Sequence, residues 1–282
     1  MERGRFVLLL VLALLTIAAW ALTVYQARTM DMPMGVAVRG GASSDMAEPA
    51  ESSGMVMPEM AMAGMASKTW SLNGFGAFLG AWAVMMAAMM LPAATPMILL
   101  FNTVYAKRRA QGNAFVPTWV FAAGYLLVWS AIGGAVYALV QLGSEVSTRL
   151  GTADREAWAP LALGATLVVA GVYQATPLKR VCLLHCQSPL GFVMRHWREG
   201  RLGALWMGVR HGAFCLGCCW ALFAVLVAAG VMSLAWMLLL TLVIFAEKVL
   251  PHGRSASLAV GVVLAGLGVL VATGATGMPW IA

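Results

Sequence analysis

All five cysteines and all four histidines of the chain fall in one part of the sequence, from Cys182 to His252. Thiolate and imidazole groups are ligands that suit copper and zinc, and chance would scatter them more widely. The clustering predicts a local metal or cofactor site, with inert helix packing and thiol redox chemistry as alternatives. Copper is the expected ion, and zinc or haem are the other candidates.

Two segments carry most of these ligands. In the first, Cys182, His185 and Cys186 would share one face of a helix at positions i, i+3 and i+4. In the second, His211 and Cys215 lie one helical turn apart, and further cysteines follow within the next turn. The predicted metal ligands are Cys182, His185, Cys186, His211, Cys215, Cys218, Cys219 and Glu247.

Glu247 and Lys248 place opposite charges side by side near the end of an apolar run. Ionisable groups at such depth are usually paired or functional. We expect Glu247 to ligate an ion or to pair with Arg210, and Lys248 to extend toward lipid headgroups. A purely structural ion pair is the alternative to a functional role.

Methionines form a third group of soft ligands. Thioethers stay unprotonated, so outside the cytoplasm they select Cu(I) or Ag(I) over harder ions. A loop between residues 26 and 69 is rich in Met, Ala, Gly, Ser and Pro, and it predicts copper capture, although Met is also a common filler of surfaces. The residues expected to capture or relay the ion are Met55, Met57, Met60, Met62, Met65, Met86, Met89 and Met90.

Met86, Met89 and Met90 belong to an apolar run that also contains Pro92 and Pro96. Each proline removes an amide donor, so we expect this helix to kink or break near the middle of a membrane. Interrupted helices often mark substrate sites in transporters. The alternative is a packed, kinked helix in which Met fills gaps.

The elements that position these residues are predicted to be membrane-spanning helices. The chain is 61% apolar and 10% charged, whereas a soluble domain is about half apolar and about a quarter charged. A span needs about 20 mostly apolar residues and must be helical in lipid. The fold class is therefore all-α and polytopic, with seven expected spans: 6–25, 75–101, 116–142, 160–176, 205–231, 233–250 and 257–276.

The positive charges predict the orientation of these spans. The net charge of +7 comes from Lys and Arg in short clusters between apolar runs, which argues for membrane-surface loops and against nucleic-acid binding. With the N-terminus inside, the inner segments hold twelve Lys and Arg residues and the outer segments five. The expected organisation is a signal anchor at 1–25, an exoplasmic loop at 26–69 and a six-helix domain at 70–282. Cleavage near Ala27 as a signal peptide is the alternative.

Several signatures are absent from the sequence. It contains no Walker A loop, no Gly fingerprint for dinucleotides, no H-E-x-x-H and no C-x-x-C-H haem attachment. These absences argue against nucleotide-driven pumping by this chain alone.

Five blocks of the chain resemble the bacterial family of predicted metal-binding integral membrane proteins, a domain of unknown function. They read WAVMMAAMMLPAATPM (82–97), GYLLVW (124–129), YQATPLKRVCLLHCQSPLGF (173–192), GVRHGAFCLGCCWALF (208–223) and FAEKVLPHG (245–253). The resemblance covers roughly residues 75–270 and leaves out the Met-rich loop. It implies a suspected metal and a location in the bacterial inner membrane, and it implies no particular reaction.

These observations together predict a membrane protein that handles copper by capture, relay or transport of Cu(I). The second hypothesis is an enzyme, either a thiol oxidoreductase or a metal-dependent oxidase that works with a partner subunit. The third is an accessory subunit in which Cys and His only pack helices. The expected partners are the lipid bilayer and a periplasmic or membrane subunit, and an oligomer is compatible with the sequence.

Overall fold

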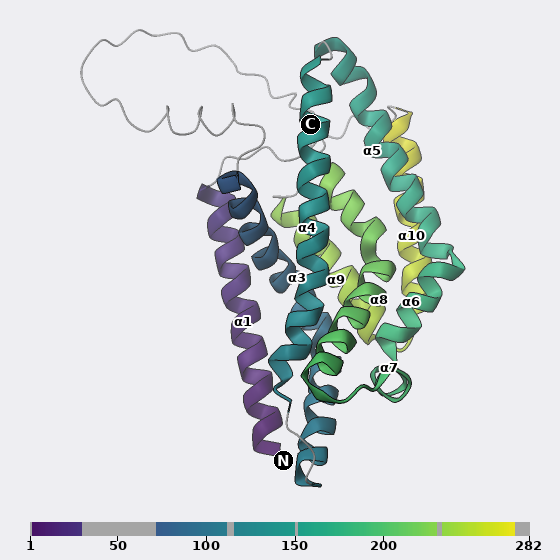
Figure 1. The fold of residues 1–282 in the computed structure, drawn as a ribbon. Helices are drawn as coiled ribbons and strands as arrows, with labels where there is room; N and C mark the ends of the chain where they lie inside the picture. The colour runs from purple at the N-terminus through teal and green to yellow at the C-terminus, as the bar shows by residue number, and fades with distance from the viewer. Residues whose placement is uncertain (1, 30–71, 112–115, 150–151, 230–232, 274–282) are drawn as a thin grey trace, which may run out of the picture.

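The computed structural model describes residues 2–29, 72–111, 116–149, 152–229 and 233–273. Within these ranges the chain forms nine α-helices and no strand, which confirms the predicted all-α class (Figure 1). The helices are α1 (Glu2–Thr29), α3 (Leu72–Ala110), α4 (Thr118–Arg149), α5 (Thr152–Ala175), α6 (Pro177–Gln187), α7 (Pro189–His196), α8 (Gly200–Ala229), α9 (Leu234–Val249) and α10 (Gly253–Ala272).

Five of these helices, α1, α3, α4, α8 and α10, are long and apolar enough to cross a membrane. The pair α5 and α6 passes the same test only as one broken span, bent by 65° at the joint. α9 has 16 residues, fewer than the about 20 that a bilayer core requires. Length and composition therefore support five spans, or six with the bent pair, where the apolar runs predicted seven.

The bend between α5 and α6 follows from the sequence Thr176-Pro177. The residue before a proline is disfavoured in the α conformation, and Thr176 is extended at φ −68° and ψ 150°. Its hydroxyl then caps α6 by accepting from the Lys179 amide at 3.3 Å, with Pro177 as the first helical residue. This arrangement turns the Cys/His segment of α6 toward the middle of α8.

Closely packed glycines hold two pairs of helices together. A Cβ added to Gly208 of α8 would lie 3.1 Å from the Cα of Gly124 in α4. A Cβ added to Gly171 of α5 would lie 2.6 Å from the Gly261 carbonyl oxygen in α10. Small residues of this kind let membrane helices approach closely. The contact between α4 and α8 brings Tyr125 of α4 next to Cys215 of α8.

α3 differs from the expectation of a break at its two prolines. It is assigned as one continuous helix that contains both Pro92 and Pro96. Neighbouring helices can hold a proline-containing membrane helix together by packing. Met86, Met89 and Met90 of this helix are all at most 1% exposed, so such packing is present here. α1 lies beside α3 (Figure 1).

Candidate metal centre

Four cysteines from two helices form a group that we call the thiol cluster: Cys186, which is partly buried, and the buried Cys215, Cys218 and Cys219. The three from α8 are each 1% exposed. Cys186 approaches from α6, and its Sγ lies 3.9 Å from the Sγ of Cys218. The Sγ atoms of Cys218 and Cys219 are also 3.9 Å apart. All five cysteines of the chain are free thiols.

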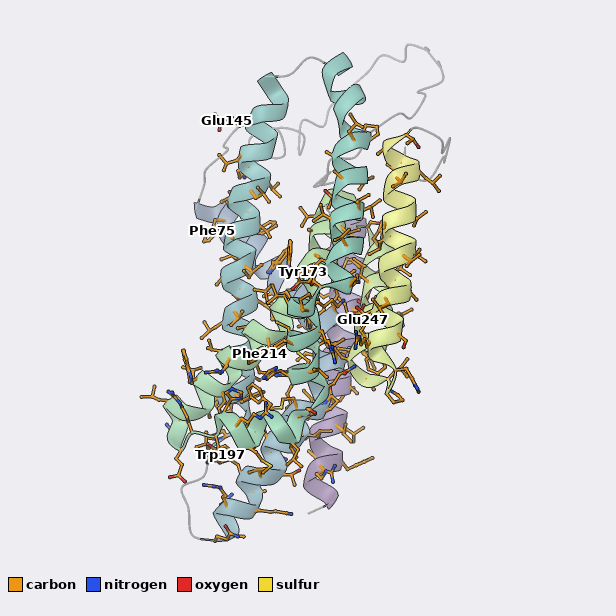
Figure 2. The ribbon with its side chains drawn as sticks, turned by 90° about the vertical axis from the view of Figure 1, so that its right-hand side faces the viewer. Phe75, Glu145, Tyr173, Trp197, Phe214 and Glu247 are labelled. Atoms are coloured by element: carbon orange, nitrogen blue, oxygen red, sulfur yellow. The ribbon has the colours of Figure 1, made fainter. Side chains whose placement is uncertain are left out.

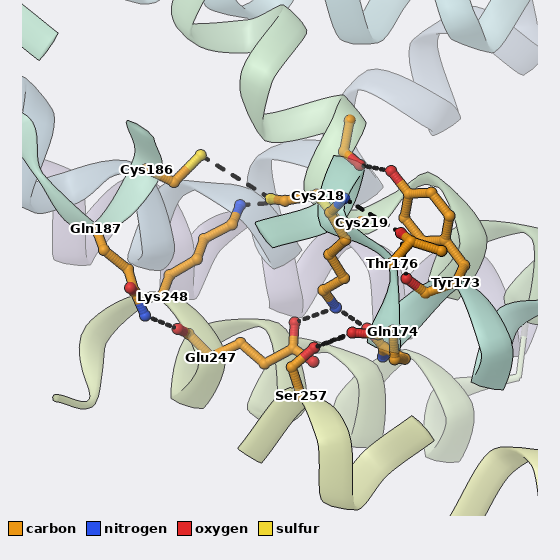
Figure 3. Close-up of polar contacts among 12 residues, drawn as sticks. Tyr173, Gln174, Thr176, Cys186, Gln187, Cys218, Cys219, Glu247, Lys248 and Ser257 are labelled. Carbon is orange, nitrogen blue, oxygen red and sulfur yellow. Dashed lines mark hydrogen bonds and ion pairs between the residues drawn. The ribbon is translucent and has the colours of Figure 1, made fainter. Parts of the chain in front are cut away.

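Lys248 of α9 extends into the thiol cluster (Figure 3). Its Nζ lies 2.9 Å from Cys215 Sγ and 3.9 Å from Cys219 Sγ, and the residue is 8% exposed. The expectation that Lys248 extends to the headgroups is therefore wrong. The inward direction is explained by the sulfur acceptors inside the bundle, which give a buried ammonium the partners it requires.

The hydrogen bonds around Cys215 identify it as the sulfur best placed to carry a negative charge. An ammonium can only donate, so Cys215 Sγ accepts from Lys248. The hydroxyl of Tyr125 in α4 is a second neighbour at 3.1 Å. Cys218 and Cys219 donate their thiol protons to the Cys215 carbonyl oxygen at 3.0 and 2.6 Å. A nearby cation favours a thiolate, which is the form that binds metals.

Glu247 belongs to a separate polar network beside the cluster. Its Oε2 accepts from Lys179 Nζ at 2.7 Å, and the two side chains are 2% and 1% exposed. Lys179 also donates to Gln174 Oε1, and Ser257 donates to the same oxygen at 3.2 Å (Figure 3). Figure 2 likewise shows Glu247 among the helices.

Arg210, one partner considered for Glu247, lies elsewhere. Its guanidinium sits 5.9 Å from the centre of the Phe214 ring. The expected pairing of Glu247 with Arg210 is therefore wrong, because Lys179 of the capped α6 helix takes that place. The carboxylate is tied to an ammonium and does not lie in the thiol cluster, although Glu247 Oε1 has no partner within the described residues.

The predicted ligands His185 and His211 differ in what their rings contact near the thiol cluster. The ring of His185 stacks on Phe214 with centroids 4.1 Å apart, and its Nδ1 contacts the Val181 carbonyl oxygen at 2.8 Å. The ring centres of His185 and His196 lie 6.1 Å apart in this aromatic group. Burial lowers the pKa of His196. Although His185 is next to Cys186 in the chain, its ring packs on Phe214.

His211 lies deeper, one turn before Cys215 on α8. Its ring is 3% exposed and packs 5.7 Å from Tyr125 and 5.4 Å from Phe192, measured between ring centres. Its Nδ1 has no hydrogen-bond partner among the described residues. A buried ring nitrogen without a partner is costly unless something binds it, so His211 remains a candidate ligand.

The other predicted residues fall into three groups. Cys182 is buried with its Sγ packed against Gly217, where an added Cβ would come within 2.7 Å of the sulfur. Its sulfur has no thiol neighbour within hydrogen-bonding distance in the described part of the chain. Met86, Met89 and Met90 are core residues of α3. The expected capture residues Met55, Met57, Met60, Met62 and Met65 lie outside the described residues.

The chemistry of the thiol cluster fits a soft monovalent ion. Two thiolates that each lie about 2.3 Å from one d¹⁰ ion are about 3.8 Å apart in tetrahedral coordination and about 4.6 Å apart in linear coordination. The two separations of 3.9 Å are short enough for one ion to contact both sulfur atoms of a pair. In the described residues, no group of three or more His, Cys, Asp and Glu side chains is arranged to hold an ion. Pairs of thiols, without the four ligands that close a structural zinc site, suit Cu(I) better than zinc.

Sequence reasoning missed two residues of this region. Tyr125 contacts Cys215 although it lies 90 positions earlier. Its signal was its place in the block GYLLVW, which carries part of the family resemblance. Lys179 is one of the basic residues between apolar runs, and its position three residues after the Thr176 helix start indicates a fixed, inward direction.

Comparison with known proteins gives a family but no individual relative. The sequence model of the PpoB2 family, described as a copper chaperone, matches residues 79–271. No curated protein and no solved structure matches the chain. The matched segment contains the thiol cluster, Lys248, Tyr125 and the buried methionines of α3. The expected link to a metal-handling family is confirmed at that level, and the chain belongs to the PpoB2 copper chaperone family.

Proposed function

We propose that this protein is a membrane copper chaperone that holds Cu(I) at the thiol cluster before passing it to an acceptor. The observation that carries the proposal is the pair of 3.9 Å sulfur separations that meet at Cys218, one to Cys186 of α6 and one to Cys219 of α8 itself. Copper is the cargo here. The family match supports the choice of copper, and soft sulfur ligands support its Cu(I) form.

Lys248 gives the cluster a way to accept a cation without gaining net charge. A thiol that binds a metal must lose its proton. When two cluster cysteines in all are deprotonated, their thiolates and one Cu(I) together carry a single negative charge, which the ammonium of Lys248 balances. The buried site therefore stays neutral when it is loaded, and this limits the desolvation cost of holding an ion there.

The route to and from the cluster follows from the predicted topology. With the N-terminus inside the bacterial inner membrane, the Met-rich loop lies outside and gathers Cu(I) from that side. The thioethers of Met86, Met89 and Met90 relay the ion through the bundle, and His211 is a further ligand near the cluster. The acceptor is a periplasmic or membrane copper protein.

Titration of the purified protein with Cu(I) tests the proposal. Without oxygen, the protein should withdraw one Cu(I) per chain from a coloured Cu(I) chelator that binds the ion more weakly than the thiol cluster does. Zinc at the same concentration should not displace that ion. No withdrawal of copper, with formation of a disulfide between two cluster cysteines under mild oxidation, would favour the thiol oxidoreductase hypothesis instead.

A further inference from the structure

A pocket of about 250 Å³ opens at the joint between α5 and α6, beside the first turn of α10. It is separate from the thiol cluster, because no cysteine lines it. The side chains that give it polar character are Gln174, Thr176, Arg180, Gln187, Arg254 and Ser257. Lys179 also lines the pocket, but its ammonium is already bound to Glu247 and Gln174.

The lining of this pocket carries positive charge that has no internal partner. The exposed guanidinium groups of Arg180 and Arg254 form no hydrogen bond or ion pair with any described residue. No Asp or Glu lines the pocket. Arginine offers a planar fork of donors that matches phosphate oxygens, and two such forks at one pocket favour an anion.

Two helix N-termini meet at the same place. α6 begins at Pro177 and α10 at Gly253, and each contributes residues of its first turns to the pocket. Neither helix has an acidic residue in its first turn. The dipole makes the first turn of a helix positive, so phosphate groups commonly bind there. In α6 the Thr176 hydroxyl already accepts from the Lys179 amide, so this end contributes through its dipole.

Gln174 supplies the independent observation that a ligand belongs here. It is 5% exposed, and its Oε1 accepts from both Lys179 and Ser257, which fixes the orientation of the amide. Its Nε2 is left as a buried donor with no partner among the described residues. An unpaired buried donor lining a cationic pocket indicates that an acceptor completes the arrangement.

We propose that the pocket at the α5–α6 joint binds the phosphate group of an anionic molecule. Arg180 and Arg254 hold the phosphate oxygens, with the N-termini of α6 and α10 behind them. The phosphate comes either from the headgroup of an anionic phospholipid or from a soluble phosphate. The proposal does not depend on the copper function, because it uses different residues.

Two binding arms and a matched pair of variants test this inference on the full chain. The first arm counts phosphatidylglycerol and phosphatidylcholine retained by the protein in native mass spectrometry. The second measures thermal unfolding in phosphatidylcholine nanodiscs with inorganic phosphate or with chloride at equal ionic strength. The test variant is R180Q/R254Q. The control is R195Q/R201Q, which removes two exposed charges that do not line the pocket.

In the lipid case, wild type and control should retain phosphatidylglycerol in preference to phosphatidylcholine. R180Q/R254Q should bind phosphatidylglycerol at least about tenfold more weakly. In the soluble case, inorganic phosphate should raise the melting temperature of wild type and control but not of R180Q/R254Q. Both replaced arginines are exposed, so helix content should be unchanged. The proposal is overturned if R180Q/R254Q matches wild type in both arms, or if the control loses as much binding.

Discussion

Replacing Cys186 and Cys218 together by serine is expected to abolish high-affinity Cu(I) binding. These two residues provide the contact between α6 and α8 at which the sulfur atoms lie 3.9 Å apart. Loss of a residue that only hydrogen-bonds to a metal ligand weakens metal binding about 10- to 100-fold. Removing two ligands should therefore weaken Cu(I) binding by more than about 100-fold. Competition with a coloured Cu(I) chelator measures the change.

The matched control is Cys182→Ser. Cys182 is a buried cysteine on the same helix as Cys186, and its sulfur packs on Gly217 without a thiol neighbour within hydrogen-bonding distance in the described residues. Its replacement should leave Cu(I) affinity within a few fold of wild type. If Cys182→Ser loses copper as fully as the double variant, the ligand set centred on Cys218 is incorrect.

The second large effect concerns the stability of the fold. Glu247→Ala leaves Lys179 as a buried cation, 1% exposed, without its carboxylate partner. Breaking a buried pair from one side costs about 3–5 kcal/mol in the free energy of unfolding. Reversible unfolding of the detergent-solubilised protein measures this cost. The double replacement Lys179→Met with Glu247→Leu should recover most of it, because no unpaired charge remains.

A surface pair gives the comparison for this measurement. Arg108 and Glu199 form an ion pair of 2.6 Å, but their side chains are 36% and 75% exposed. Glu199→Ala should therefore change stability by about 0–1 kcal/mol. A cost for Glu247→Ala no larger than the cost for Glu199→Ala would show that the buried network does not stabilise the bundle.

Apolar runs predicted the helices because lipid leaves the backbone no other hydrogen-bonded arrangement. They predicted less about where a helix bends or how far it extends. α9 ends at Val249 because Leu250 precedes Pro251 and adopts an extended conformation, so the run 233–250 gives a shorter helix than its apolarity suggests. The prolines of α3 act differently, since packing holds that helix together through Pro92 and Pro96.

The thiols of the candidate site could be predicted as a group from their spacing, because i, i+3 and i+4 neighbours share a helix face. Contacts between helices could not. Glu247 pairs with Lys179 across 68 positions, and the spacing of charges along one helix carries no information about that partner. His185 likewise stacks on Phe214 of another helix, α8, and the spacing within α6 carries no information about that contact.

The coordination of copper in the loaded protein tests the central claim most directly. X-ray absorption at the copper edge should show Cu(I) with sulfur neighbours at about 2.3 Å, the distance of other d¹⁰ thiolate bonds. Those sulfur neighbours should be lost in the variant that lacks Cys186 and Cys218. A first shell made mainly of nitrogen or oxygen, or a sulfur shell unchanged in that variant, would contradict a copper site at the thiol cluster.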